Sequence, residues 1–235
     1  MTINGINVDV VQKDIKNLHL AVYPPEGRVR IAVPEKTNQE AIRLFVISKM
    51  GWIKKKRKQF KDQERQSKRE FISGESHYFK GKSYILRVKY HSAPARIETK
   101  NKKYIDLYVR EKSTPEYRQK AIFNWYRDEL KRQTPKLVEK WEKNTNIKVK
   151  DWRIKRMKTK WGTCNRSAKR IWLNLELAKK PAHCLEYILV HEMVHILEKH
   201  HTDLFRSYMM KFIPKWKLYR DELNGFVLNH EKWEF

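Results

Sequence analysis

One apolar segment, ILVHEMVHILEKHH at residues 188–201, limits the ways in which this chain can fold. It places His191 and His195 four residues apart, with Glu192 directly after the first histidine. The surrounding residues are mostly apolar, which predicts a buried helix. Polar groups on such a helix are costly to bury unless they bind a metal or are hydrogen-bonded. The fold must therefore provide this helix with either a metal ion or a set of polar partners.

The spacing of the two histidines suits a metal. Residues four apart on an α-helix differ by about 40° around the axis, so both imidazoles can reach one cation. Zinc accepts nitrogen ligands and is bound tetrahedrally. Glu192 lies beside them, where its carboxylate can take a proton from a metal-activated water and pass it to a leaving amine. We therefore predict a Zn2+ site with His191 and His195 as ligands and Glu192 as the catalytic base and acid. The alternative is a helix whose polar face is satisfied by neighbouring side chains.

A catalytic zinc site needs a third protein ligand. His201 lies six residues after His195, an offset known from the H-E-x-x-H-x-x-G-x-x-H arrangement. The glycine position of that arrangement holds Glu198 here, so the chain must turn back by another route. We favour His201, because the residues HTDLF at 201–205 look like a new helix start, with Thr202 as its cap. The competing candidates are His200, Glu222 and Glu231.

The charge of the chain indicates an anionic partner. Lys and Arg number 53 and Asp and Glu 27, which gives a formal net charge of +26. A strongly basic run follows Trp52, and its cations are candidate nucleic-acid contacts: Lys54, Lys55, Lys56, Arg57, Lys58, Lys61 and Arg65. This run supports a second hypothesis, a nucleic-acid-binding protein in which the metal site is structural or vestigial. The plain alternative is a solvated helical arm on a basic surface.

The remaining composition favours an intracellular protein. The two cysteines, Cys164 and Cys184, form no disulfide framework and fit a reducing compartment. Cys164 is more readily explained as a buried thiol than as a ligand or nucleophile. The N-terminus does not resemble a signal peptide, and no apolar run approaches the roughly 20 residues that span a bilayer. We therefore expect a cytoplasmic protein without a membrane partner.

The hydrophobic pattern changes along the chain from strands to helices. Residues 19–23 and 29–33 read as a hairpin, and a helix with Thr37 or Asn38 as its cap leads into the basic run. Strands return between 74 and 110, with a turn at 80–82. Pro115 then begins a long helix with a kink or break at Pro135. Residues 146–177 read as strand, turn, strand, and Pro181 is placed in the first turn of the histidine-bearing helix.

Two stretches resemble a known family. KWGTCNRSAKRIWLNLELAKKP at 160–181 and LEYILVHEMVHILEKHHTDLF at 185–205 are similar to the signature of the YgjP-like metallopeptidases, a group related to the SprT and Spartan proteases. That signature has a Trp-Gly-Ser-Cys turn, a Leu-Asn strand, His-Glu-Leu-x-His, and then Asn-His-Ser-x-x-Phe. The positions that match are Trp161–Cys164, Leu173, Asn174, His191–His195, His201 and Phe205, and GESHYFKGK at 74–82 also matches. Thr163 and Thr202 replace serines, and His200 precedes the third histidine.

The resemblance implies His191, His195 and His201 as zinc ligands and Glu192 as the catalytic residue. We therefore expect an α+β protein that hydrolyses peptide bonds in a protein or peptide substrate. Residues 1–112 are expected to be a mostly β region with a basic helix. Residues 113–235 are expected to be a zincin-like helical domain with a small antiparallel sheet over the metal helix. An extended substrate could pair with an edge strand beside that helix, and RIWLNLEL at 170–177 is the candidate strand. The alternative is that 170–177 forms an ordinary interior or edge strand without a role in substrate binding. Action on nucleic-acid-associated proteins is an expectation by analogy with the Spartan relatives.

Overall fold

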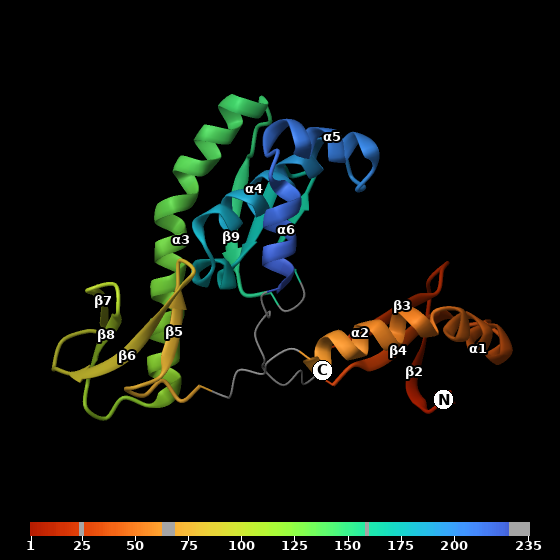
Figure 1. Ribbon diagram of the computed structural model, residues 1–235, viewed down its shortest axis with the longest axis horizontal. Coiled ribbons are helices and arrows are strands. Elements are labelled where there is room, and N and C mark those ends of the chain that lie inside the picture. Colours follow the sequence, from red (N-terminus) through yellow and green to blue (C-terminus); the bar gives the residue numbers. More distant parts are fainter. Residues whose placement is uncertain (24–25, 63–68, 158–159, 226–235) are drawn as a thin grey trace. The chain divides into compact units, whose positions relative to one another are not determined.

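The protein has a mixed α+β fold, shown in Figure 1. The computed structural model describes residues 1–23, 26–62, 69–157 and 160–225, without the side chains of 59–62. This part of the chain contains six α-helices and three small sheets. It packs into two compact units, one formed by the described residues up to 62 and the other by those from 69 onward. Each unit has its own hydrophobic core.

The first unit is a four-stranded sheet followed by two helices. Its elements are β1 (Thr2–Ile3), β2 (Ile6–Lys13), β3 (His19–Tyr23), β4 (Arg28–Pro34), α1 (Gln39–Ser48) and α2 (Met50–Asp62). The strand order is β1-β2-β4-β3. The expected hairpin is confirmed, because β3 pairs antiparallel with β4 from His19–Ala32 to Tyr23–Arg28. The strands alternate apolar and polar side chains, so one face can bury apolar residues against the helices.

The predicted helix after the hairpin begins at its expected cap. The Asn38 side chain accepts a hydrogen bond from the backbone N–H of Glu40, at 3.0 Å. Lys49 interrupts the helix, so the basic run lies on the separate helix α2. Only Ile53 of the α2 residues 51–58 is fully buried. Helix α2 is therefore held by few apolar contacts and presents most of its cations to solvent.

The second unit opens with the sheet formed by residues 76–109. Its strands are β5 (Ser76–Phe79), β6 (Lys82–Tyr90), β7 (Arg96–Lys100) and β8 (Tyr104–Val109), in the order β5-β6-β8-β7. The predicted turn joins β5 to β6, and Lys80 and Gly81 both have positive φ, as a two-residue hairpin requires. A Cβ on Gly81 would lie 2.7 Å from Cγ of Pro181. The hairpin tip therefore packs closely against the start of the histidine-bearing helix.

The sheet of β5–β8 belongs to the second unit because hydrogen bonds attach it to the 3-10 helix η1 (Leu175–Lys179) and to helix α3 (Pro115–Thr145). The hydrophobic pattern predicts instead that these residues belong to an N-terminal region of residues 1–112. The backbone N–H of Lys80 donates to Ala178, at 3.0 Å, and that of Gly81 donates to Lys179, at 3.1 Å. The buried Tyr126 hydroxyl donates to the carbonyl of Tyr78, at 2.7 Å. These contacts link residues far apart in sequence, so pattern alone does not reveal them.

The rest of the second unit surrounds the histidine-bearing helix. Its elements are α3 (Pro115–Thr145), β9 (Asp151–Lys155), β10 (Gly162–Asn165), β11 (Arg170–Asn174), the 3-10 helix η1 (Leu175–Lys179), α4 (Ala182–Leu197), α5 (Asp203–Phe212) and α6 (Trp216–Gly225). Helix α3 begins at Pro115 as predicted, and it continues through Pro135, so of the expected kink or break the break does not occur. Pro181 is the N-cap of α4, just before the first turn in which it was expected.

The sheet beside α4 differs from the expected antiparallel sheet. Its order is β10-β11-β9, and β10 pairs antiparallel with β11 while β9 pairs parallel with β11. A short turn reverses the chain between β10 and β11. Strand β9 lies beyond β11 and enters the sheet in the same direction as it. Strand β11 is therefore central, and the prediction that 170–177 forms an edge strand is wrong.

Candidate metal centre

Helix α4 holds the predicted metal-binding motif in the centre of the second unit. Most of its residues are buried, among them Leu189, Val190 and Met193 on both sides of the first histidine. The helix packs against strand β10 and against helices α5 and α6. This apolar packing fixes the backbone of α4, so the direction of His191 and His195 follows from the helix itself.

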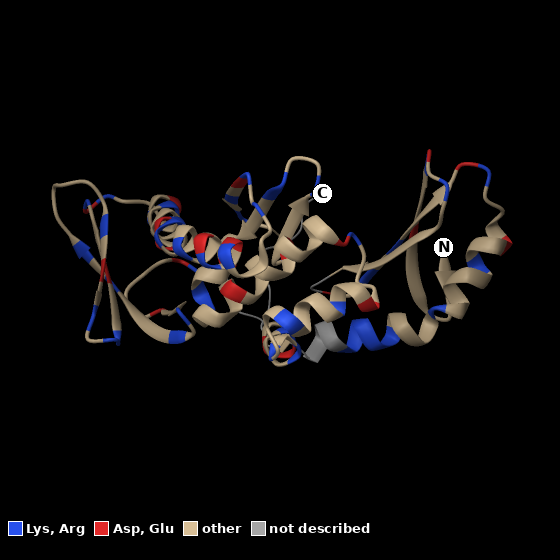
Figure 2. Cartoon of the chain, turned by 90° about the horizontal axis from the view of Figure 1, so that it is seen from above, with Lys and Arg blue, Asp and Glu red and all other residues tan. Residues whose placement is uncertain are grey.

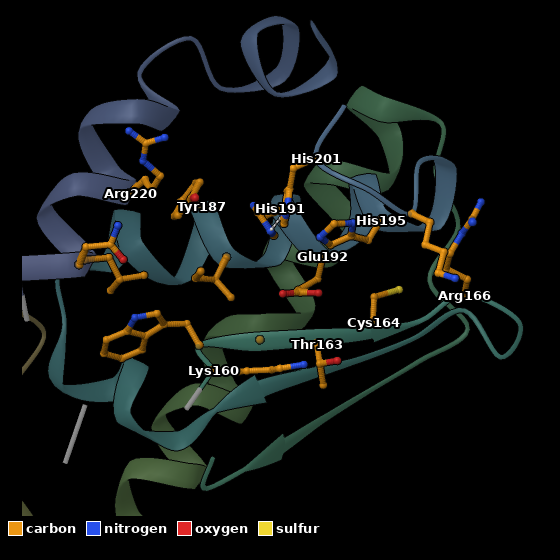
Figure 3. Close-up of a pocket in the computed structure, with 16 residues that line it drawn as sticks. Lys160, Thr163, Cys164, Arg166, Tyr187, His191, Glu192, His195, His201 and Arg220 are labelled. Atoms are coloured by element: carbon orange, nitrogen blue, oxygen red, sulfur yellow. Dashed lines mark hydrogen bonds between the residues drawn. The ribbon is translucent and has the colours of Figure 1, made fainter. Parts of the chain in front are cut away.

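Three imidazole rings converge on one point, as Figure 3 shows. Their centroids are 4.8 Å apart for His191 and His195, 5.0 Å for His191 and His201, and 4.8 Å for His195 and His201. The Nε2 atoms of His191 and His201 are 3.1 Å apart. One nitrogen of each ring lies within 4.8 Å of those of the other two. Two nitrogens on one tetrahedral zinc ion would be about 3.4 Å apart, so this group fits a divalent metal.

The chain reaches His201 without the glycine of the related arrangement. Helix α4 ends at Leu197, and Glu198 has φ −125° and ψ 118°, a conformation open to any residue. The Glu198 carboxylate accepts from the backbone N–H of His200, at 3.0 Å. The N–H of Thr202 donates to the carbonyl of His200, at 2.8 Å. An extended residue and these hydrogen bonds thus turn the chain back toward α4.

Helix α5 completes the histidine cluster. Thr202 is its N-cap as predicted, and its hydroxyl accepts from the N–H of Phe205, at 3.3 Å. The Phe205 side chain is 1% exposed. Its ring centroid lies 5.0 Å from that of His191 and 4.7 Å from those of His195 and His201. One aromatic ring therefore packs against all three histidines and restricts how they can rotate.

The protonation of the two helical histidines suits metal binding. The Nδ1 atom of His195 is 3.0 Å from the carbonyl oxygen of Glu198. A carbonyl only accepts, so Nδ1 carries the proton and Nε2 keeps its lone pair. Burial, and next the neighbouring His195 and His201, lower the pKa of His191 to about 3. Burial likewise lowers the pKa of His195. Neutral imidazole is the form that binds a metal.

Glu192 is buried against strand β10. It is 5% exposed, and a Cβ on Gly162 would lie 2.7 Å from its Oε1 atom and 2.8 Å from its Cγ atom. Glycine at 162 therefore makes room for the glutamate. Burial raises the pKa of Glu192 to about 8, and the charge of Lys160 opposes that rise. A carboxyl with a pKa near neutrality is suited to take up and release a proton.

The cluster opens into a cleft of about 440 Å3. The cleft is lined by His191, Glu192, His195 and His201 together with Lys160, Trp161, Gly162, Thr163, Cys164, Arg166, Tyr187, Ile188, Lys199, Arg220, Leu223 and Asn224. Sequence reasoning missed Lys160, Arg166, Tyr187 and Arg220. Only Tyr187 had a signal, because it lies four residues before His191 on the same face of α4.

Tyr187 presents a hydroxyl group to the cleft beside the first histidine. Its side chain is 3% exposed, and its ring packs edge-on to that of His191, with 5.8 Å between the centroids. Among the described residues the hydroxyl has no hydrogen-bond partner. Burial raises its pKa to about 12, so it stays protonated and can donate a hydrogen bond.

The competing third ligands lie elsewhere or outside the described residues. His200 is exposed and does not join the cluster. The Glu222 carboxylate is 2.6 Å from Nε2 of His183, which links α6 to the start of α4. Glu231 lies outside the described residues. A second group with metal-binding atoms consists of His183, Cys184 and Glu222. The short hydrogen bond between His183 and Glu222 already uses one ligand atom of each of these two residues.

The remaining site predictions divide between the two units. Cys164 lines the cleft but is half-buried, and burial raises the pKa of its thiol to about 11, as expected for an unreactive thiol. The candidate nucleic-acid contacts lie on α2 in the first unit. Lys54, Lys55, Arg57 and Lys58 are exposed there and Lys56 is half-buried. The side chain of Lys61 and the whole of Arg65 lie outside the described residues.

The site combines two histidines one helical turn apart, a third histidine from the following segment, and a buried carboxylate beside them. Metal-dependent hydrolases of the H-E-x-x-H type have this kind of site. The chain belongs to the YgjP-like family, whose metallopeptidase domain model matches residues 16–226. This family implies a bound metal, and the three histidines are a group that could hold it. A comparison with curated proteins finds no match. None of the described helices is both long enough and apolar enough to cross a bilayer.

Proposed function

We propose that this protein is a zinc-dependent peptidase in which His191, His195 and His201 bind Zn2+ and Glu192 transfers protons. The observation that carries the proposal is the convergence of three imidazoles in one cleft with a buried carboxylate beside them. Zinc is favoured over harder divalent cations because the donor set consists of neutral nitrogens. When bound, the ion would polarise the scissile carbonyl and acidify a water molecule.

Glu192 acts first as a base and then as an acid. Its carboxylate takes a proton from the attacking water and delivers it to the nitrogen of the leaving amine. The close contact with Gly162 restricts the carboxylate to the side of α4 that faces β10. Tyr187 is suited to donate its hydroxyl proton in a hydrogen bond to the oxygen of the scissile carbonyl as negative charge develops there.

The substrate backbone is proposed to pair with strand β10. Among the described residues, only the β11 side of β10 is paired in the sheet. An extended peptide could add to the open side by backbone hydrogen bonds. Gly162, Thr163 and Cys164 of this strand line the cleft, so such a peptide would pass the histidine cluster. The proposal thus assigns to β10 the substrate-pairing role that the sequence predicts for 170–177.

The decisive experiment compares the wild type with Glu192→Gln. The glutamine keeps the size of the side chain but cannot accept the proton, so peptide hydrolysis should fall at least about a hundredfold. Zinc content should stay near one ion per chain in both proteins, measured by atomic emission. Glu139→Gln, on the exposed surface of α3, is the control and should cleave like the wild type. Equal cleavage by Glu192→Gln, or a wild type that binds no zinc, would contradict the proposal.

A second candidate function is nucleic-acid binding, with the metal site structural or vestigial. The observation in its favour is α2, where Lys and Arg cover much of the helix in Figure 2. No described carboxylate forms an ion pair with Lys54, Lys55 or Lys58. Binding through α2 should weaken steeply as salt is raised. If DNA accelerates the cleavage of a DNA-binding protein, the chain has both functions. If DNA does not bind, or binds equally well at high salt, nucleic-acid binding is excluded as a function.

A further inference from the structure

The cleft around the histidine cluster is strongly basic. Four of the residues that line it are cations, namely Lys160, Arg166, Lys199 and Arg220. Glu192 is the only carboxylate among the described lining residues. Glu192 is the proposed proton carrier, and no other acidic side chain among the described lining residues is available to balance these cations. An acidic segment of a substrate could supply that balance.

The cations bracket the strand along which a substrate would lie. Lys160 precedes β10 and Arg166 follows it. In Figure 3, Arg166 lies beyond His195 at one end of the cleft, while the Lys160 side chain extends below Glu192. Arg220 lies at the opposite end, near Tyr187. A peptide paired with the four residues of β10 would cover about 13 Å, so its side chains on both sides of the scissile bond would approach cations.

Hydrogen bonds hold the backbone of Lys160 and the guanidinium of Arg166 in place, and among the described residues neither side chain forms an ion pair with a carboxylate. The carbonyl of Lys160 accepts from the amide of Asn174, at 2.7 Å, and Asn174 is fully buried. Arg166 donates to the carbonyl of Leu197, at 3.0 Å, and to that of Ile196, at 3.4 Å.

Arg220 contributes less to this basic surface, because its charge is already paired. Its guanidinium donates to Asp221 at 2.9 Å, and a second nitrogen is 2.8 Å from the same carboxylate. Lys199 is exposed at the end of α4. Lys160 and Arg166 are therefore the pair whose charge is most available to a substrate.

From these observations we infer that the cleft selects peptide segments with acidic side chains on both sides of the scissile bond. This inference rests on the proposed peptidase function and names its substrate class. Lys160 recognises the acidic residue on one side of the bond and Arg166 the residue on the other. A peptide is favoured over nucleic acid because the open edge of β10 offers backbone hydrogen bonds that a peptide strand can match.

The test uses four peptides that share one central sequence. One carries Glu on both sides of the centre, two carry it on one side only, and the fourth has Gln at all of these positions. Binding is measured by fluorescence anisotropy with zinc-loaded Glu192→Gln, and kcat/KM with the wild type. We expect the doubly acidic peptide to exceed the Gln peptide about tenfold in both, with the difference shrinking as salt rises.

Charge reversals then assign each side. Lys160→Glu should remove the preference for one singly acidic peptide and Arg166→Glu that for the other. Lys120→Glu, which makes the same charge change on the exposed surface of α3, is the control and should leave the preferences unchanged. Because Arg166 also contacts the end of α4, Arg166→Lys serves as a second variant. It loses the paired hydrogen bonds but keeps the charge, so the preference should survive.

The outcomes separate this inference from the proposed function. Equal cleavage of all four peptides by the wild type would overturn the inference and leave the peptidase function intact. No hydrolysis of any peptide, together with acid-selective binding, would contradict the peptidase function and support the specificity of the cleft. An equal loss of preference in Lys120→Glu would show that overall charge is responsible. Displacement of the acidic peptide by single-stranded DNA, with the same dependence on Lys160 and Arg166, would also overturn the inference.

Discussion

At the residue scale, Glu192 and the three histidines lie in one cleft whose lining also includes residues from distant parts of the chain. His191, Glu192 and His195 follow from helical spacing, and the structure places His201 with them. Their roles as ligands and base remain predictions. The contact between Gly162 and Glu192 could not be predicted, because the two lie thirty positions apart and meet only when β10 packs against α4. Asn174 is similar: the family signature includes it, but its buried hydrogen bonds to Met157 and Lys160 appear only in the fold.

The Gly162 contact leads to a direct prediction. In Gly162→Ala the new methyl group would lie 2.7 Å from Oε1 of Glu192 and 2.8 Å from Cγ2 of Ile188. The carboxylate must move, so peptide hydrolysis should fall at least about tenfold, with a loss of stability of about 1–3 kcal/mol. Zinc binding should change little, because the three histidines are not displaced. The measurements are kcat, zinc content and urea unfolding.

Gly51→Ala is the matched control for this substitution. A Cβ on Gly51 meets nothing within 4 Å, and alanine favours a helix such as α2. It should unfold at the same or higher urea concentration and cleave at the rate of the wild type. Full activity in Gly162→Ala would mean that the carboxylate does not need its present position.

At the element scale, local signals predicted helix starts well and sheet order poorly. Asn38 and Thr202 cap their helices through a side-chain oxygen as predicted, a signal that lies within four residues, and Pro115 begins α3 as predicted. The central place of β11 depends on β9 joining from far along the chain, and no local pattern encodes that pairing. At Pro135 a local signal for a helix break is overridden, because tertiary packing keeps α3 helical through a residue that usually disrupts helices.

The cap of α5 should affect metal binding as well as stability. Thr202→Ala removes the hydroxyl that accepts from the N–H of Phe205, and it should cost about 1 kcal/mol of stability. His201 and Phe205 adjoin this cap, so the affinity for zinc should also fall several-fold. Competition with a chromophoric chelator measures the affinity, and urea unfolding measures the stability.

Thr114→Ala removes the same kind of cap from α3, where the hydroxyl accepts from the N–H of Tyr117 at 3.3 Å. It should lose a similar amount of stability and keep the zinc affinity of the wild type. If both variants bound zinc equally well, the position of His201 would not depend on the start of α5.

At the scale of the whole molecule, the chain combines two units that are stabilised separately. One core contains Val29, Ile31 and Val46, and the other contains Tyr126, Leu173 and Phe205. The change in hydrophobic pattern near residue 112 does not mark this division. We expect urea to unfold the two units of the full chain in separate transitions, and acidification should affect them differently.

One source of this difference is His77, which lies outside the metal cluster and is 3% exposed within the second unit. Burial, and next the charge of Arg69, lower its pKa to about 4 from the ordinary value of 6.5. Below pH 6.5 the unfolded chain therefore binds a proton that the folded unit does not, so stability falls as pH decreases toward 4. The loss across this window is on the order of 3 kcal/mol.

Urea unfolding at pH 7.5 and pH 5 tests this. The transition of the second unit should move to lower urea at pH 5, and His77→Gln should make that shift smaller. The same shift in wild type and variant would show that other groups cause the acid sensitivity.

The open edge of strand β10 has one more consequence. A strand without a neighbour on one side can pair with the same strand of another copy and start aggregation. Lys160 and Arg166 stand at the two ends of this edge, so two copies approaching edge to edge would bring like charges together. The cations proposed to attract acidic peptides would thus also keep the molecules from associating through their own cleft strands.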